Sequence, residues 1–202
     1  MPGAADRIPR SDARRNRARL TEVAAAAFRD EGLDVGVDEL ARRAGVGVAT
    51  LYRHFPAKTD LIHAVADLVL DDLEAAAAGA LASGQPAGAV ARFLRAALAL
   101  ERRNGGLLHL VADRHLPADR RGALGRRARA ILAPVVRAGH ESGAIRRELG
   151  AADLLVVLRM LTVASTASRR RSPEYLGLLL RGLADPSPDP LGQPDDDARR
   201  AA

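Results

Sequence analysis

The chain has 202 residues, of which 48% are hydrophobic and 28% are charged, with a formal net charge of +6. This balance predicts a globular protein large enough to bury a core, and its basic character favours an acidic partner, nucleic acid first. Because the sequence contains no cysteine, disulfides, zinc–thiolate sites and a cysteine nucleophile are excluded, and a cytoplasmic location is expected.

The positive charge is concentrated at the N-terminus, where residues 1–20 hold six arginines against two aspartates. Such a basic terminus is as typical of a solvated arm as of a segment that contacts DNA. We expect no export signal and no membrane partner. The longest apolar stretch, LLVVLRMLTVA, is interrupted by Arg159 and is far too short to span a bilayer.

Apolar residues recur with helical spacing throughout, and no alternating run of β-branched residues indicates a strand. The first helix carries its apolar stripe from Leu20 to Phe28 and should end at Gly32. A short second helix over 37–44 should be closed by Gly45, and a third should run from Val48 until Pro56 ends it.

Longer helices are predicted after Pro56, and Pro134 should kink or split one of them. Their expected ranges are 57–78, 87–103, 107–114, 119–141, 151–169 and 173–184. Residues 185–202 hold four prolines and five aspartates with little to bury, which is typical of a disordered tail. The sequence thus predicts an all-α protein with an N-terminal unit over 10–56 and a larger unit over 57–184.

The second and third helices, joined by Ala44-Gly45-Val46-Gly47, have the dimensions of a helix-turn-helix, whose second helix enters the major groove of DNA. At about 100° per residue, one side of the third helix gathers an apolar set that should anchor it. The other side is free to contact DNA, and Tyr52 falls at its edge. The anchoring set is Val48, Leu51 and Phe55, and the outward set is Ala49, Thr50, Arg53 and His54.

Arg53 lies nearest the centre of the outward side, and its guanidinium matches guanine O6 and N7 as a bidentate donor. Tyr52, His54 and Lys58 flank that side where phosphates would pass. Lys58 also opens the next helix, whose first amides and positive dipole end favour an anion. These residues therefore divide into one base-reading candidate and three phosphate-contacting candidates.

The segment VDELARRAGVGVATLYRHFPAKTDLIHAV resembles the DNA-binding region of the TetR family of bacterial transcriptional repressors. The resemblance extends back to about residue 14 and rests on the A-G-V, T-L-Y, H-F and P-x-K elements at family spacing. It implies phosphate contacts, base contacts and a basic first helix that approaches the DNA backbone. The implied phosphate-contacting residues are Thr50, Tyr52, His54 and Lys58, the base-contacting residues are Val48, Ala49 and Arg53, and the first-helix residues are Arg14 and Arg17.

Two glycines depart from the family pattern. Gly47 replaces the usual serine that caps the recognition helix, and Gly36 replaces a threonine or serine before the second helix. Hydroxyl contacts to phosphate are therefore absent at both positions, although glycine is a tolerable cap.

Other site patterns are incomplete. GVGVAT lacks the third glycine and the preceding strand of a dinucleotide-binding loop, and HESGA lacks the second histidine of a zinc protease. His109, Asp113 and His115 lie close together but have no fourth metal ligand. Because no nucleophile–base pair stands out, we expect neither an enzyme nor a bound metal or cofactor. The alternative to a regulator is an all-helical interaction protein that does not bind DNA.

The resemblance implies a repressor that occupies operator DNA and is released by a small-molecule effector. Polar groups such as His109, Arg159 and Thr162, set among leucine, valine and alanine, suggest a pocket for an apolar or amphiphilic effector. The last two helices carry more leucine than a small domain readily hides, which predicts a homodimer through a four-helix bundle and a palindromic operator. The leucines concerned are Leu154, Leu155, Leu158, Leu161, Leu176, Leu178, Leu179 and Leu180.

Overall fold

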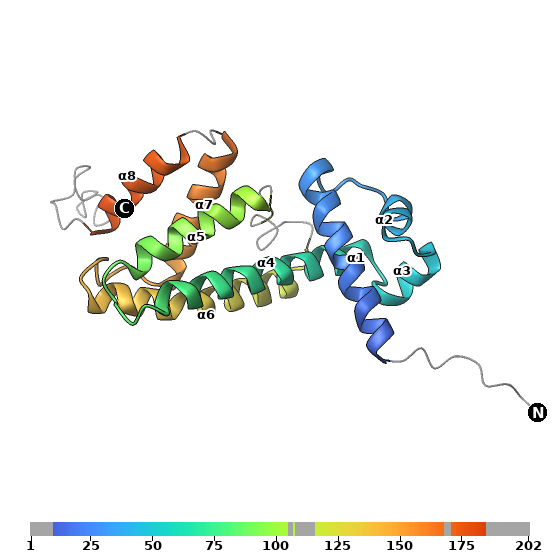
Figure 1. Cartoon of the computed structure of the whole chain (residues 1–202), viewed down its shortest axis with the longest axis horizontal. Coiled ribbons are helices and arrows are strands. Elements are labelled where there is room, and N and C mark those ends of the chain that lie inside the picture. The colour runs from blue at the N-terminus through green and yellow to red at the C-terminus, as the bar shows by residue number, and fades with distance from the viewer. Residues whose placement is uncertain (1–9, 105–106, 108–115, 168–170, 185–202) are drawn as a thin grey trace, which may run out of the picture.

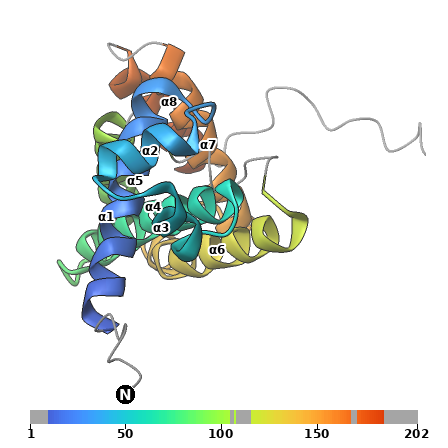
Figure 2. The ribbon, with the colours of Figure 1, turned by 90° about the vertical axis from the view of Figure 1, so that its right-hand side faces the viewer.

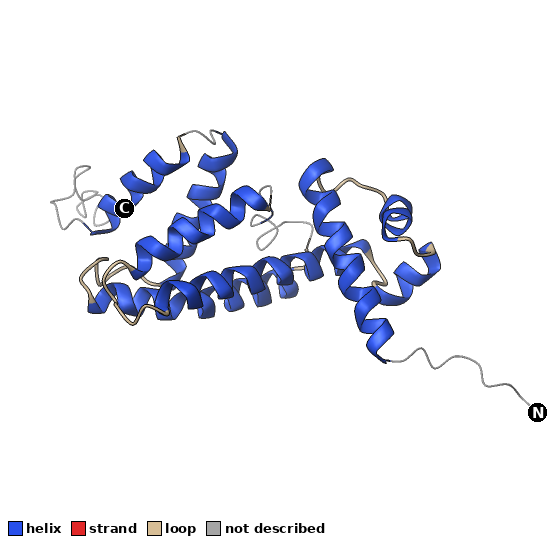
Figure 3. Ribbon diagram, viewed as in Figure 1, coloured by secondary structure: helices blue, strands red, loops and turns tan. Residues whose placement is uncertain are grey.

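The computed structural model describes residues 10–104, 107, 116–167 and 171–184, and within these it contains helices and no strand (Figure 3). The all-α prediction is therefore confirmed. The helices are α1 (Arg10–Glu31), α2 (Val37–Ala44), α3 (Val48–His54), α4 (Lys58–Leu81), α5 (Ala89–Arg103), α6 (Ala118–Glu141), α7 (Ala151–Ala167) and α8 (Ser172–Ala184).

Helices α1 to α3 form a three-helix cluster at one end of the molecule, while α5 to α8 occupy the other (Figure 1). Helix α4 is the long element between them: its beginning packs against α1, and its remaining length packs along α5 and α6. In the turned view the three-helix cluster faces the reader, with α2 and α3 beside α1 (Figure 2). A change in the position of α4 would therefore alter its packing against α1 at one end of the molecule and against α5 and α6 at the other.

One continuous core follows this path. Leu20 and Phe28 from α1 and Leu61 and Val65 from α4 are all at most 4% exposed. Buried residues of α5, α6 and α7 continue the same cluster. Because a buried aliphatic side chain stabilises the fold by about 1.5–3 kcal/mol, this apolar contact fixes α4 against α1.

The predicted helix ranges agree with the described helices to within about three residues. Two further predictions concern residues that the structure leaves undescribed. The predicted helix over 107–114 and the tail over 185–202 lie outside the described residues, apart from Leu107. Helix α6 is not split at Pro134 but continues to Glu141. The missing proline amide costs about 3 kcal/mol, and burial of Ile131, Leu132, Val135 and Val136 around it outweighs that cost.

Among the described helices, none combines the length and the apolar character that a membrane-spanning helix requires.

Candidate nucleic-acid interface and cavity

The turn between α2 and α3 depends on Gly45, which has φ +63° and ψ 36° in the left-handed region. Its N–H donates to the Arg42 carbonyl over 3.1 Å, and the Val46 N–H donates to the Ala41 carbonyl over 3.0 Å. These bonds satisfy carbonyls that the end of α2 would otherwise leave without a partner. Gly47 then precedes α3 in an extended conformation, with no side-chain cap.

Helix α3 has one buried side and one exposed side. Leu51 and Phe55 are 0% exposed, so they hold the helix to the core. Ala49, Tyr52 and Arg53 are exposed and form what we call the exposed α3 face. The other residues expected to contact DNA, Val48, Thr50, His54 and Lys58, are half-buried around it.

Arg17 links α1 to the end of α3. Its Nη1 donates to the His54 carbonyl over 2.7 Å, and its guanidinium carbon lies 4.2 Å from the centre of the Phe55 ring. The first contact satisfies a carbonyl at the C-terminus of α3, and the second is a cation–π interaction. Arg17, expected from the resemblance to approach the DNA backbone, thus also orients α3. Arg14 lies one turn earlier and is exposed.

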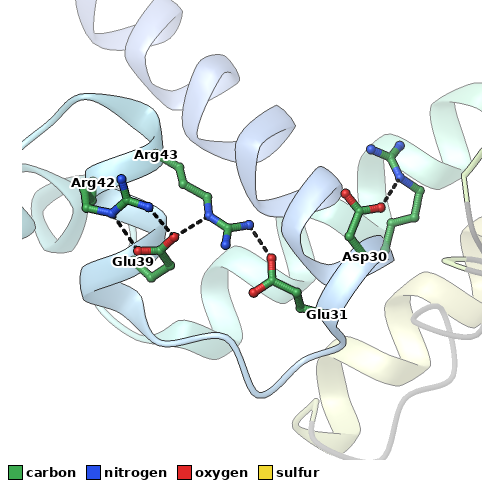
Figure 4. Close-up of polar contacts among 6 residues, drawn as sticks. Asp30, Glu31, Glu39, Arg42 and Arg43 are labelled. Atoms are coloured by element: carbon green, nitrogen blue, oxygen red, sulfur yellow. Dashed lines mark hydrogen bonds and ion pairs between the residues drawn. The ribbon is translucent and has the colours of Figure 1, made fainter.

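A cluster of ion pairs joins α2 to the end of α1 (Figure 4). Arg43 bonds to Glu39 over 2.6 Å and also pairs with Glu31, while Arg42 donates to both oxygens of Glu39 over 2.7 and 2.6 Å. The bonds from Arg42 and then Arg43 lower the pKa of Glu39 to about 2. Glu39 is therefore ionised in the folded protein at neutral pH.

The first turn of α4 carries both signs of charge. Lys58 is its first residue, and the Asp60 carboxylate accepts the Ala57 N–H over 2.7 Å. Arg120 of α6 lies 2.5 Å from the other Asp60 oxygen. Burial raises the pKa of Asp60, but the bonds from Arg120 and the Ala57 amide outweigh it and leave that pKa below the ordinary value. Arg120 thereby offsets a negative charge beside the position where Lys58 would meet phosphate.

A cavity of about 190 Å³ lies between α4, α6 and α7. Two of the three residues proposed from sequence to bind an effector, Arg159 and Thr162, line it. The third, His109, lies outside the described residues, as do Asp113 and His115. The described residues that line it are Leu70, Leu73, Arg121, Gly125, Ala128, Arg129, Leu155, Leu158, Arg159 and Thr162. Sequence reasoning missed Arg121 and Arg129, although these residues and Gly125 repeat at a spacing of four on α6.

Among the described residues, no group of three or more histidine, cysteine, aspartate or glutamate side chains is placed to hold a metal ion.

Of the eight leucines expected to form the dimer surface of the last two helices, Leu178 is exposed, and Leu155, Leu179 and Leu180 are half-buried. Leu154, Leu158, Leu161 and Leu176 are at most 5% exposed, because they pack inside their own chain. The exposed apolar residues are Val156 (55%), Met160 (54%), Val163 (68%) and Leu178 (57%). We call these four the α7–α8 apolar face. Sequence spacing alone did not separate the core-facing leucines from these outward positions.

The sequence profile described as "Bacterial regulatory proteins, tetR family" matches residues 20–65, which include α2, the turn and α3. A helix-turn-helix-type transcriptional regulator from Staphylococcus aureus is 41% identical over 63 residues, which is 31% of this chain and 34% of that protein. The match thus spans about a third of this curated relative.

Solved structures extend the similarity to most of the chain. A TetR transcription regulatory protein from Mycobacterium vanbaalenii is 32% identical, with a TM-score of 0.59, over 87% of this chain and 99% of that one. The TetR transcriptional regulator SCO0520 from Streptomyces coelicolor is 28% identical, with a TM-score of 0.56, over 85% and 99% of the two chains. The proteins found to be similar are thus named as regulators of transcription.

Proposed function

Because the chain belongs to the TetR family of bacterial regulatory proteins, we propose that it is a transcriptional repressor released from its operator by a small-molecule effector. We propose that residues 10–56 bind DNA and residues 57–184 bind the effector and a second copy of the chain. A repressor of this kind acts on the chromosome, so its place of action is the cytoplasm.

The observation that carries the proposal is the exposed α3 face. Ala49, Tyr52 and Arg53 are exposed while Leu51 and Phe55 hold the helix from behind, as a helix that enters the major groove requires. Arg53 is the candidate for a bidentate guanine contact. Tyr52 and Lys58, on either side of it, are the candidates for contacts with the DNA backbone.

The α7–α8 apolar face supports a homodimer. Its four residues, Val156, Met160, Val163 and Leu178, are each more than half exposed. Contact between this face and the same face of a second copy would bury both sets of side chains. A twofold interface of this kind is self-complementary. Two copies would present two α3 helices related by a twofold axis, and the operator proposed is therefore palindromic.

The position of α4 supports release by an effector. Leu70 and Leu73 line the cavity from α4, and Lys58 begins the same helix beside the three-helix cluster. A ligand that binds one placement of α4 more tightly shifts the protein toward that placement. A tenfold loss of operator affinity needs about 1.4 kcal/mol of coupling, and the operator must weaken effector binding by the same factor.

The test begins with selection of binding sites from random DNA, followed by fluorescence anisotropy on the selected site and on unrelated DNA. Arg53→Ala should cost about 1–3 kcal/mol on the selected site and relax one base preference. Lys58→Ala should weaken binding to all sequences alike and flatten the dependence on salt. Arg137→Ala, an exposed arginine on α6, is the matched control and should change neither.

The competing proposal is an interaction protein that does not bind DNA, and it predicts the opposite result in the same binding experiment. It expects no selected site and no steep dependence of binding on salt. Equal losses from Arg53→Ala on every sequence would leave DNA binding intact but remove the base-contacting role of Arg53.

A further inference from the structure

The cavity between α4, α6 and α7 has an apolar wall and a basic wall. Leu70, Leu73, Leu155 and Leu158 form most of the first, and Arg121, Arg129 and Arg159 supply the second. Thr162 also lines the cavity, and no aspartate or glutamate is among the lining residues that the structure describes. Arg121, which is half-buried, and Arg129 and Arg159, which are exposed, thus line a space whose other described residues are mostly aliphatic.

The arginines of the cavity differ from those on the opposite side of α6. There, Arg120 pairs with Asp60, and Arg127 pairs with Asp67, Asp71 and Glu74 of α4. Within the described part of the chain, by contrast, no carboxylate lies within ion-pair distance of any of the three cavity arginines. Arg121 donates a side-chain hydrogen bond to the Leu116 carbonyl over 3.0 Å.

Small residues leave the space between these arginines open. Gly125 has no side chain and Ala128 has only a methyl group, so these two residues between Arg121 and Arg129 fill little of the cavity. At about 190 Å³ the cavity is smaller than the 300–1,000 Å³ typical of sites for drug-sized ligands. Its occupant is accordingly a small molecule.

We propose that the ligand of this cavity is a small aliphatic molecule with an anionic head group, a carboxylate or a phosphate. This inference rests on the proposed function, in which the cavity receives the effector. The planar forks of Arg129 and Arg159 match either head group as bidentate donors, whereas the Thr162 hydroxyl already donates to the Arg159 carbonyl over 2.8 Å. The leucines of α4 and α7 take the aliphatic body, whose burial drives binding.

Isothermal titration calorimetry of the full chain with four probes of equal chain length tests this proposal: sodium octanoate, octyl phosphate, 1-octanol and octylamine. We expect at least one of the two anions to bind at least about tenfold more tightly than 1-octanol, and octylamine to bind more weakly still. The relative affinities of octanoate and octyl phosphate then identify which head group the arginines accept.

Arginine-to-glutamine variants test whether the cavity arginines recognise the negative charge of the probes. Arg129→Gln and Arg159→Gln should each weaken binding of the preferred anion about tenfold and leave 1-octanol unchanged, because only the charge-assisted bonds are lost. Arg137→Gln, on α6 but outside the cavity, should leave all four probes unchanged. Equal affinity for 1-octanol and both anions, or an equal effect of Arg137→Gln, would overturn the proposal.

Operator binding measured on the same preparations separates this inference from the proposed function. If the protein binds its selected operator but neither anion binds, the ligand class is wrong and DNA binding stands. If the preferred anion binds in an arginine-dependent manner and leaves operator affinity unchanged, the ligand class is supported and release by this ligand is refuted. Failure to bind any selected DNA would refute the repressor itself.

Discussion

Replacing Gly45 by alanine tests whether the left-handed turn after α2 stabilises the three-helix cluster. Gly45 has φ +63°, a conformation that costs an L-residue about 1–2 kcal/mol. An added Cβ would also lie 3.0 Å from Nη2 of Arg19. That contact is with the far end of an exposed, flexible side chain, which moves away at little cost, so the backbone conformation decides the result.

We therefore expect Gly45→Ala to lower the free energy of unfolding by about 1–2 kcal/mol, or the melting temperature by about 2–8 °C if the chain unfolds in one transition. Urea and thermal unfolding followed by helical circular dichroism measure both quantities. The matched substitution is Gly79→Ala, since Gly79 lies within α4 and an added Cβ there meets nothing within 4 Å.

Gly79→Ala should stabilise the protein by up to about 1 kcal/mol, because alanine is the better helix former. The two variants make the same chemical change, so opposite signs would isolate the effect of backbone conformation. An unchanged or raised stability of Gly45→Ala would refute the reasoning, whatever the effect of Gly79→Ala.

Three further results are expected. Leu51→Ala, which empties a fully buried position of α3, should destabilise the protein by about 2–5 kcal/mol in urea unfolding; a loss below about 1 kcal/mol would show that α3 is not held by this contact. The pKa of Glu39 falls from 4.5 to about 2 on folding, so its ion cluster stabilises the protein fully above pH 4.5 and progressively less as the pH falls toward 2. The difference in unfolding free energy between the wild type and Glu39→Gln should therefore be constant near neutral pH and shrink as the pH falls from 4.5 toward 2, and an undiminished difference at pH 2 would contradict it. Val156→Glu should dissociate the proposed homodimer in sedimentation experiments, whereas Ala133→Glu, on the exposed side of α6, should leave it intact; a dimer that survives Val156→Glu would place the interface elsewhere.

Local spacing predicted the helices of this fold well because the apolar residues within each helix mark its buried side. Leu20 and Phe28, which bound the first apolar stripe, and Leu51 and Phe55 are examples, and all four are buried in the structure. Glycine at positive φ similarly marked the end of α2. These features depend on residues within a few positions of one another, and periodicity detects such relationships directly.

Contacts between distant residues were not predictable in the same way. The bond from Arg17 to the His54 carbonyl spans 37 positions, and nothing in either local pattern specifies it. The pairing of Arg120 with Asp60 and the meeting of Arg129 with Arg159 depend on how α6 lies against α4 and α7. An arginine in an amphipathic helix fits solvent, an ion pair or a ligand equally well, and only the neighbouring helix distinguishes these roles.

The division of α3 into a buried and an exposed side bears on how the recognised DNA sequence can change during evolution. Ala49, Tyr52 and Arg53 contribute little to the core, and substitutions at exposed positions usually alter stability by no more than about 0.5 kcal/mol. Leu51 and Phe55 carry the stability of the helix instead. If these residues contact DNA as proposed, mutations that redirect the protein to another operator are nearly neutral for folding, and the recognised sequence can change while the scaffold is kept.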